Sequence, residues 1–204
     1  MAKIVLIGAS GTIGIAIADR LGSKHTIIRV GHRQGDHTVD MSSKASIEAL
    51  FQNTGPCDHV ICAAGLSRFA AFDEASDEDY AVSIQHKLMG QVNLARIARR
   101  HVSSGGSITI TTGLLARDPM PGTAPTAMVN AGLEGFVRAA ALDLAGGARI
   151  NAVSPIFVTA TAERMGMPAA GTMSAAETAR AYEAAVNGDM TGQVLDARDF
   201  GAVE

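Results

Sequence analysis

The sequence predicts an α/β fold, a single doubly wound parallel sheet with helices on both faces. Three observations support this prediction. Short apolar runs alternate with longer amphipathic stretches, which is typical of βαβ units. A glycine-rich loop directly follows the first apolar run. Of the 204 residues, 47% are hydrophobic and no linker or repeat divides them, so we expect one domain over residues 1–204.

The first half of the chain predicts three strands separated by two helices. Ile4–Ile7 and Thr26–Val30 are short apolar runs, as buried strands of a parallel sheet usually are. Between them, Ile13–Leu21 is an amphipathic stretch that follows the glycine loop and predicts a helix. A second helix over Lys44–Phe51 leads to a third strand, His59–Cys62.

The second half continues the alternation. A helix that begins near Asp77 is expected to run to about His101, and the Ala-, Leu- and Glu-rich stretch Thr126–Leu144 predicts another long helix. The other expected elements are the strands Ile108–Thr111, which is β-branched and flanked by glycines, Arg149–Val153 and Gln193–Leu195, and a helix over Ala175–Val186. The segment Thr159–Met173, rich in Met, Gly, Pro and Ala, is expected to be a mobile lid.

Charge and cysteine content limit the classes of partner. A net charge of −3 argues against nucleic acid or an anionic membrane, because both attract basic surfaces. The two cysteines, Cys57 and Cys62, lack the spacing of a zinc site or a disulfide framework, so we expect free thiols and no metal. The first apolar run is too short to span a bilayer. These features predict a cytoplasmic protein.

The strongest local motif is a Gly-x-x-Gly-x-x-Gly run between the first strand and the first helix. Glycines at this spacing allow a tight turn and let the backbone approach a pyrophosphate, which the helix N-terminus then binds. A generic glycine-rich turn is the alternative, and the strand–turn–helix context argues against it. The residues expected to bind a nicotinamide dinucleotide are Gly8, Ser10, Gly11, Thr12, Ile13 and Gly14.

The end of the second strand indicates which nicotinamide cofactor is preferred. A site for NAD usually has Asp or Glu here to hold the ribose 2′-hydroxyl. This strand instead ends in Gly31-His32-Arg33, without a carboxylate. The Arg33 guanidinium can bind a 2′-phosphate and Ser10 can add a hydroxyl donor, whereas a solvated surface charge is the alternative for Arg33. The pattern favours NADP(H) over NAD(H).

Four further motifs match one known protein family over nearly the whole chain. They are Asp40-Met41, Cys62-Ala63-Ala64-Gly65, Asn151–Pro155 with Val158-Thr159, and Thr191-Gly192. Together they resemble the short-chain dehydrogenase/reductase family, which implies a Rossmann-type fold. In that family the first motif binds the adenine, the second flanks the adenine ribose, and the third holds the nicotinamide carboxamide. The resemblance therefore implies cofactor contacts from Asp40, Met41, Ala63, Ala64, Gly65, Pro155, Val158 and Thr159.

The catalytic residues of the family are missing from this chain. The family uses a Tyr as proton donor, a Lys four residues later, a Ser thirteen residues before the Tyr, and an Asn on the preceding long helix. An ungapped alignment gives the corresponding residues in the same order: Thr126, Asn130, Gly113 (preceded by Thr111 and Thr112) and Lys87. Neither Tyr80 nor Tyr182 is followed by a Lys at the fourth position.

These substitutions indicate a different proton donor. A threonine hydroxyl is a far weaker acid than a phenol, so we expect Thr126, with Thr112 nearby, only to hydrogen-bond the substrate. Asn130 can bind the nicotinamide ribose but carries no charge. A partly desolvated Lys87 has a lowered pKa and can act as a general acid, or as an electrostatic partner for developing negative charge. A solvated lysine, or one at a dimer contact, is an equally good interpretation of Lys87.

Three functions remain open. The first is an NADP-dependent oxidoreductase acting on a small carbonyl or alcohol with a non-standard proton donor. The second is a catalytically silent NADP-binding sensor or regulatory partner, and the third is a non-redox enzyme on the same scaffold. The resemblance also implies a homo-oligomer, a dimer or tetramer, that pairs the long helices around Asp77–His101 and Thr126–Leu144. A small-molecule substrate is the other expected partner.

Overall fold

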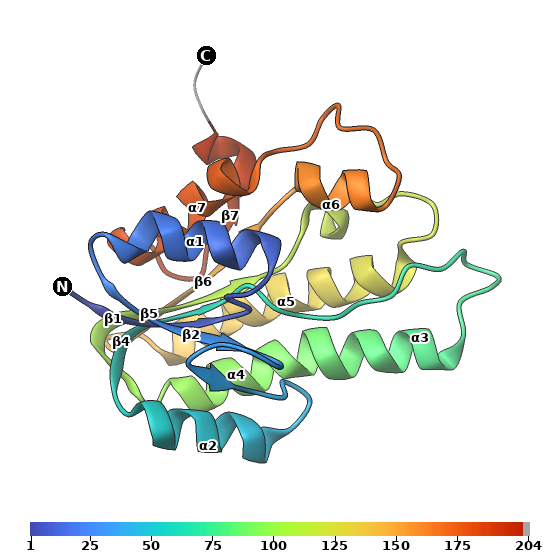
Figure 1. Cartoon of the computed structure of the whole chain (residues 1–204). Coiled ribbons are helices and arrows are strands. Elements are labelled where there is room, and N and C mark those ends of the chain that lie inside the picture. The colour runs from blue at the N-terminus through green and yellow to red at the C-terminus, as the bar shows by residue number, and fades with distance from the viewer. Residues whose placement is uncertain (202–204) are drawn as a thin grey trace.

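A seven-stranded parallel sheet organises the chain (Figure 1). The structure is a computed structural model, and it describes residues 1–201. Short apolar runs form the strands because both faces of the sheet are buried. The strands are β1 (Lys3–Ile7), β2 (Thr26–Gly31), β3 (His37–Thr38), β4 (Cys57–Cys62), β5 (Val102–Thr111), β6 (Arg149–Ser154) and β7 (Val194–Asp196).

The strand order is β3-β2-β1-β4-β5-β6-β7, so the winding direction reverses between β1 and β4. Every pairing is parallel, for example Ile7 opposite Val30 in β2 and opposite Cys62 in β4. This topology confirms the predicted doubly wound sheet. In such sheets, ligands bind outside the carboxyl ends of the strands at the reversal.

Helices cover both faces of the sheet (Figure 1). One face packs against α1 (Thr12–Gly22) and α7 (Ala175–Asn187), and the other against α2 (Lys44–Thr54), α4 (Gly90–Ala98) and α5 (Ala124–Asp143). The remaining helical segments are α3 (Asp77–Val82), the π-helix η1 (Ser83–Met89), the 3₁₀ turns η2 (Leu114–Ala116) and η3 (Ala197–Phe200), and α6 (Thr159–Arg164).

The structure differs from the predicted elements in several places, of which three concern the helices and the expected lid. The long helix expected over Asp77–His101 is α3, a π-helical segment and α4 in succession, and it ends at Ala98. The long helix expected from Thr126 begins at Ala124, because Pro125 fits the first turn of a helix. The expected lid Thr159–Met173 contains α6, and its ends are joined by a bridge between Val158 and Met173.

Candidate active site

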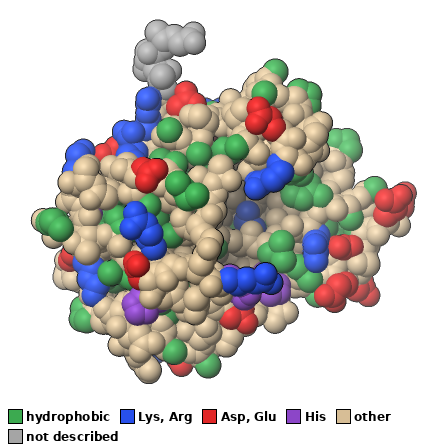
Figure 2. Space-filling model, in the orientation of Figure 1, with side chains coloured by type: hydrophobic (Ala, Val, Ile, Leu, Met, Phe, Trp, Pro, Cys, Tyr) green, Lys and Arg blue, Asp and Glu red, His purple; other side chains and the backbone are tan. Residues whose placement is uncertain are grey.

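Two adjoining cavities lie along the carboxyl ends of the strands. The outer cavity measures about 510 Å³ and the inner cavity about 400 Å³. Ala63, Ala64 and Gly65, which follow β4, line both cavities and form the wall between them. Figure 2 shows a hollow near the middle of the corresponding face, with hydrophobic and basic side chains around it. The two cavities together make a groove across the point where the strand order reverses.

The glycine loop forms one wall of the outer cavity. Gly8 has a φ of 84°, and its N–H and that of Ala9 donate hydrogen bonds to Val30 O at 2.8 and 3.1 Å. A Cβ on Gly8 would lie 2.8 Å from the Ala63 backbone, and one on Gly14 only 2.0 Å from Gly8 O. Both positions therefore require glycine. This packing brings the first turn of α1, with its unpaired N–H groups, to the groove.

Polar side chains line the rest of the outer cavity. Ser10 and His32 lie at the end of β2, where a Cβ on Gly31 would be 3.3 Å from Ser10 Oγ. Asp40 and Met41 form the opposite part of the lining. Asp40 accepts hydrogen bonds from the Ser42 hydroxyl at 2.7 Å and from the Ser42 N–H at 2.9 Å, and these bonds lower the pKa of its carboxyl. This cavity therefore contains an ionised carboxylate and hydroxyl and imidazole groups.

Lys87 provides the positive charge of the inner cavity, whose lining also includes the carboxylate of Asp118. It lies in η1, and its Nζ donates to Thr112 O at 3.1 Å. Burial lowers the pKa of the ammonium to about 8. Within residues 1–201, no carboxylate pairs with it. The structure thus places a cation that makes no ion pair with any described residue in a mostly apolar cavity, rather than on a solvated helix face.

Asn130 reaches the carbonyl next to the one that Lys87 binds. Asn130 lies in α5 with 1% of its surface exposed, and its Nδ2 is 3.5 Å from Gly113 O. Its Oδ1 is buried and has no hydrogen-bond partner in the protein. A buried acceptor without a partner in the protein is open to a donor from a water molecule or a ligand. Lys87 and Asn130 therefore approach the inner cavity from two helices.

The two threonines predicted to contact substrate also line the inner cavity, but their hydroxyl protons are engaged. The Thr126 hydroxyl donates to Arg68 O at 2.8 Å and lies 3.0 Å from Ser67 Oγ. The Thr112 hydroxyl donates to Val153 O at 3.4 Å. In this structure the Thr126 proton is bound to Arg68 O in the loop after β4, and the hydrogen bond from Thr126 to a substrate stays a prediction.

Most of the residues predicted to bind cofactor line one of the two cavities. Four do not: Thr12, Gly14, Arg33 and Thr159. Gly14 acts through the close packing described above, and Thr12 begins α1. Arg33 is exposed in the bend after β2. Thr159 is used inside the α6 segment, where its N–H donates to Met173 O and its hydroxyl contacts Thr172.

Several apolar residues of the inner cavity were not predicted. Phe69 and Phe157 come from loops 88 residues apart in the sequence, and their ring centroids are 6.4 Å apart. η2 contributes Leu114 and Leu115, and Met120 follows it. No local pattern marks these residues, because loops bring them together from separate parts of the chain. They give the cavity an apolar lining around Lys87.

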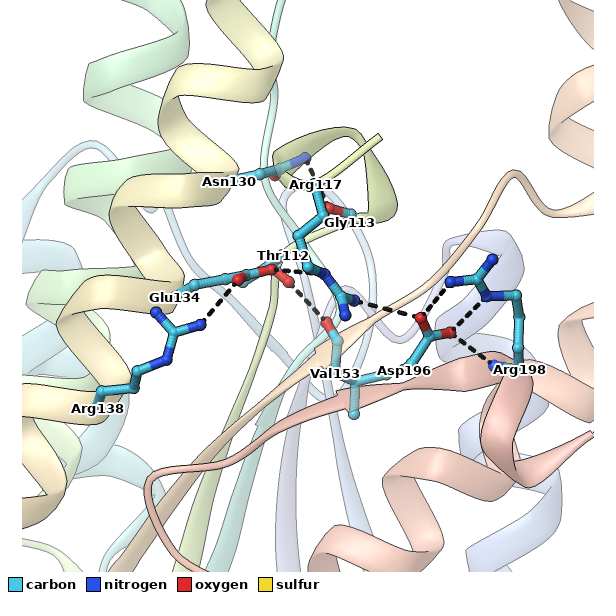
Figure 3. Close-up of polar contacts among 9 residues, drawn as sticks. All are labelled: Thr112, Gly113, Arg117, Asn130, Glu134, Arg138, Val153, Asp196 and Arg198. Atoms are coloured by element: carbon cyan, nitrogen blue, oxygen red, sulfur yellow. Dashed lines mark hydrogen bonds and ion pairs between the residues drawn. The ribbon is translucent and has the colours of Figure 1, made fainter. Parts of the chain in front are cut away.

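An ion-pair cluster holds the loop that carries η2, and Figure 3 shows its members. Arg117 pairs with Glu134 of α5 at 3.5 Å and with Asp196 at the end of β7 at 3.4 Å. Arg138 and Arg198 complete the cluster at 3.1 Å from Glu134 and 2.7 Å from Asp196. The guanidinium of Arg198 is the largest cause of the lowered pKa of Asp196. Arg117 thus connects the cavity loop to two buried anchors.

Comparison with known proteins identifies the family. A family model described as Enoyl-(Acyl carrier protein) reductase matches residues 8–193. The chain belongs to the short-chain dehydrogenase/reductase family. This confirms the resemblance and its Rossmann-type fold. Within residues 1–201, no helix is long and apolar enough to cross a membrane.

Several solved structures superpose closely on the chain. The protein lin1944 from Listeria innocua is 36% identical, with a TM-score of 0.92, and the match covers 96% of this chain and 99% of that one. A small-chain dehydrogenase in complex with NADPH is 29% identical, with a TM-score of 0.85 and 95% of each chain covered.

Curated relatives include a hydroxynaphthalene reductase of Aspergillus fumigatus, 29% identical over 61% of this chain and 46% of the relative. A 3-oxoacyl-[acyl-carrier-protein] reductase of Rattus norvegicus is 25% identical over 76% of this chain and 65% of the relative. The chain spans about half the length of the first curated relatives that it matches. Its membership in this oxidoreductase family nevertheless rests on nearly the whole fold.

Proposed function

We propose that this protein is an NADP(H)-dependent oxidoreductase that acts on a small carbonyl compound or the corresponding alcohol, with Lys87 as the proton donor. The observation that carries the proposal is the Lys87 ammonium, which lies in a mostly apolar cavity and makes no ion pair with a carboxylate of residues 1–201. The reductases among the relatives and the NADPH complex of a structural neighbour support the reaction class.

The groove fits a nicotinamide dinucleotide. The first turn of α1 and the glycine loop would hold the pyrophosphate, and Asp40 and Met41 would border the adenine. The orphaned Oδ1 of Asn130 would accept a hydrogen bond from a ribose hydroxyl, and Pro155 and Val158 would border the nicotinamide. When bound, the nicotinamide supplies or accepts the hydride at the substrate carbon.

The preference for NADP rests on the end of β2. Ser10 and His32 line the outer cavity where a 2′-phosphate would lie, and the strand ends without a carboxylate. Arg33 does not line the cavity, so it would contribute only if its side chain reorients. We therefore assign the 2′-phosphate primarily to Ser10 and His32.

Lys87 would exchange a proton with the substrate oxygen. In the reducing direction its ammonium donates to the substrate oxygen, and in the oxidising direction the neutral amine accepts the proton. A pKa of about 8 suits both directions near neutral pH. Because only the protonated form donates, we expect carbonyl reduction to decline as the pH rises through about 8 and alcohol oxidation to increase.

The inner cavity limits the substrate. Its volume is about 400 Å³ and must also contain the nicotinamide. Phe69, Phe157 and Leu114 make most of the remaining surface apolar. A small carbonyl compound with an apolar body fits this space.

A specific observation favours a second function, a catalytically silent NADP-binding sensor. The Thr126 hydroxyl proton is bound to Arg68 O, so the α5 position that carries Tyr in the family has no free donor. If Lys87 transfers no proton to a substrate, the protein binds cofactor without turnover.

Titration with NADPH and NADH tests the cofactor assignment first. Tight binding of NADPH and much weaker binding of NADH are expected, and binding of neither nucleotide would contradict the proposal. A screen of small aldehydes, ketones and imines with NADPH then follows, with Lys87→Met as the variant and Lys44→Met, which changes an exposed lysine, as the control. Loss of turnover only in Lys87→Met supports the oxidoreductase. NADPH binding without any turnover supports the sensor.

We also propose that one domain spans residues 1–204 and that the protein is a cytoplasmic homo-oligomer. Exposed apolar side chains on η1 and α5, namely Ile84, Met89 and Met128, support pairing between copies. Light scattering coupled to size exclusion would test this, and a monomer at micromolar concentration would contradict it.

A further inference from the structure

The segment η1–α4 is bound to the end of β5 by two side chains four residues apart. Lys87 donates to Thr112 O at 3.1 Å. Gln91, which is 0% exposed, donates from Nε2 to Thr111 O at 2.8 Å and accepts from Thr111 N–H at Oε1, also at 2.8 Å. A single amide therefore satisfies both backbone groups of one residue.

The backbone of Thr111 needs this partner because its neighbouring strand has ended. The pairing of β4 with β5 stops at Ile61 and Thr109. On the other side, β6 continues, and Thr112 N–H donates to Val153 O. The N–H and C=O of Thr111 therefore point away from β6 to where β4 has ended, and Gln91 takes the place of a strand.

Gly65 makes room for both side chains. A Cβ at this position would lie 3.0 Å from Lys87 Cγ and 3.4 Å from Gln91 Nε2. The two side chains thus pass the wall between the cavities side by side. Any shift of Gln91 relative to β5 also shifts Lys87, because the π-helix and α4 are continuous.

We propose that Gln91 is a positioning residue that sets the location of the Lys87 ammonium by holding η1–α4 against the end of β5. The inference rests on the proposed role of Lys87 but concerns its environment, so it can be tested without substrate. Gln91 is too deeply buried to touch substrate itself. Without its amide, the Thr111 N–H and C=O are buried and unpaired, so the helix separates from the strand or water enters.

The test is the titration of Lys87 by trace acetylation with acetic anhydride at a series of pH values, read by peptide mass spectrometry. The chain has only four lysines, Lys3, Lys24, Lys44 and Lys87, so each is resolved. In the wild-type protein Lys87 should titrate near pH 8, well below the ~10.4 of a solvated lysine. In Gln91→Met it should move at least about one unit toward the ~10.4 of a solvated lysine.

Leu94→Ala is the matched control, because it removes a buried side chain of the same helix without touching Thr111. It should lower the melting temperature but leave the Lys87 titration unchanged. An unchanged titration in Gln91→Met, or an equal shift in both variants, overturns the proposal. A wild-type Lys87 that titrates near the ~10.4 of a solvated lysine also overturns it. If Lys87 titrates near pH 8 and responds to Gln91→Met as expected, but the protein turns over no substrate, the proposed function is refuted and this inference stands.

A measurement on the wild-type protein covers the case in which Gln91→Met does not fold. Hydrogen exchange followed by NMR should show a slowly exchanging Thr111 amide, although this residue ends its strand. Rapid exchange of that amide would mean that the bond to Gln91 is absent, and would overturn the proposal.

Discussion

The partly buried Lys87 ammonium does not stabilise the folded state. A cation in an apolar cavity loses hydration, and the single carbonyl of Thr112 does not replace it. The same desolvation that lowers its pKa to about 8 therefore destabilises the folded state at neutral pH. Residues of this kind are retained for function rather than for stability.

Replacing Lys87 by Met should consequently stabilise the protein at pH 7, by on the order of 2 kcal/mol. The folded-state pKa lies below the unfolded value, so between about pH 8 and ~10.4 the folded state binds fewer protons. Wild-type stability thus rises relative to Lys87→Met across this window, and the advantage of the variant shrinks. Urea unfolding of both proteins at pH 7 and pH 9.5 measures the difference. The free energy of unfolding of Lys44→Met should stay within about 0.5 kcal/mol of the wild-type value at both pH values. A stabilisation of Lys44→Met equal to that of Lys87→Met would contradict this prediction.

The sequence allowed Lys87 and Asn130 to be proposed as site residues, since both stand at positions that the family uses. It did not indicate that the Thr126 hydroxyl is engaged. Its partner, Arg68 O, lies 58 residues earlier, in a loop without a local pattern. The exclusion of Arg33 from the outer cavity likewise depends on the conformation of a bend, which the sequence does not determine.

At the scale of elements, the loop between β5 and α5 depends on Arg117. η2 places Leu114 and Leu115 in the inner cavity, and the loop is anchored through Glu134 and Asp196 (Figure 3). Glu134 has 5% of its side chain exposed, so its pairs with Arg117 and Arg138 are less screened by solvent than surface pairs are.

Arg117→Met should therefore loosen this loop. The loss of two partly exposed ion pairs is expected to weaken it by about 1 kcal/mol, which corresponds to roughly five-fold faster amide exchange over residues 113–122. Hydrogen–deuterium exchange with mass spectrometry measures this. Arg138→Met is the control, because it also removes a partner of Glu134 but does not touch the loop. Equal exchange in the two variants would show that Arg117 does not anchor the loop.

The elements themselves were largely predictable. Each apolar run became a strand at the expected place, because strands buried on both faces carry a strong pattern. β3 was missed, since its two residues are too few for any pattern. The π-helix was also missed, because an apolar periodicity marks the stretch as helical but does not distinguish i→i+5 from i→i+4 hydrogen bonds.

On the scale of the whole molecule, the groove joins the two halves of the sheet. The outer cavity belongs to the side with β1 and β2, and the inner cavity to the side with β5 and β6. A ligand that occupies the outer cavity alone should therefore report the 2′-phosphate contacts independently of Lys87.

Adenosine 2′,5′-bisphosphate is such a ligand. At 100 times its Kd it should stabilise the protein by about 2.7 kcal/mol, whereas adenosine 5′-phosphate at the same concentration should have much less effect. Thermal unfolding measures the shift. Ser10→Ala should reduce the difference between the two ligands, and Arg33→Ala should reduce it less, because only Ser10 lines the cavity. If Arg33→Ala reduced the difference between the two ligands more than Ser10→Ala did, the 2′-phosphate site would have to be assigned to Arg33 instead.

Lys87 and Asn130 donate hydrogen bonds to two consecutive backbone carbonyls, those of Thr112 and Gly113, although the two side chains come from different helices. The family resemblance implies the reverse arrangement, with the amide on the earlier helix and the ammonium on α5. The site therefore has room for one cation, and either helix can supply it. Asn130→Lys alone should bring two ammonium groups together and destabilise the protein, and Lys87→Asn alone should remove the charge. The double exchange should regain the stability lost in Asn130→Lys, and urea unfolding of the three variants would show it. Regained stability in the double exchange would mean that the fold requires one positive charge at this point in space, whichever of the two helices carries it.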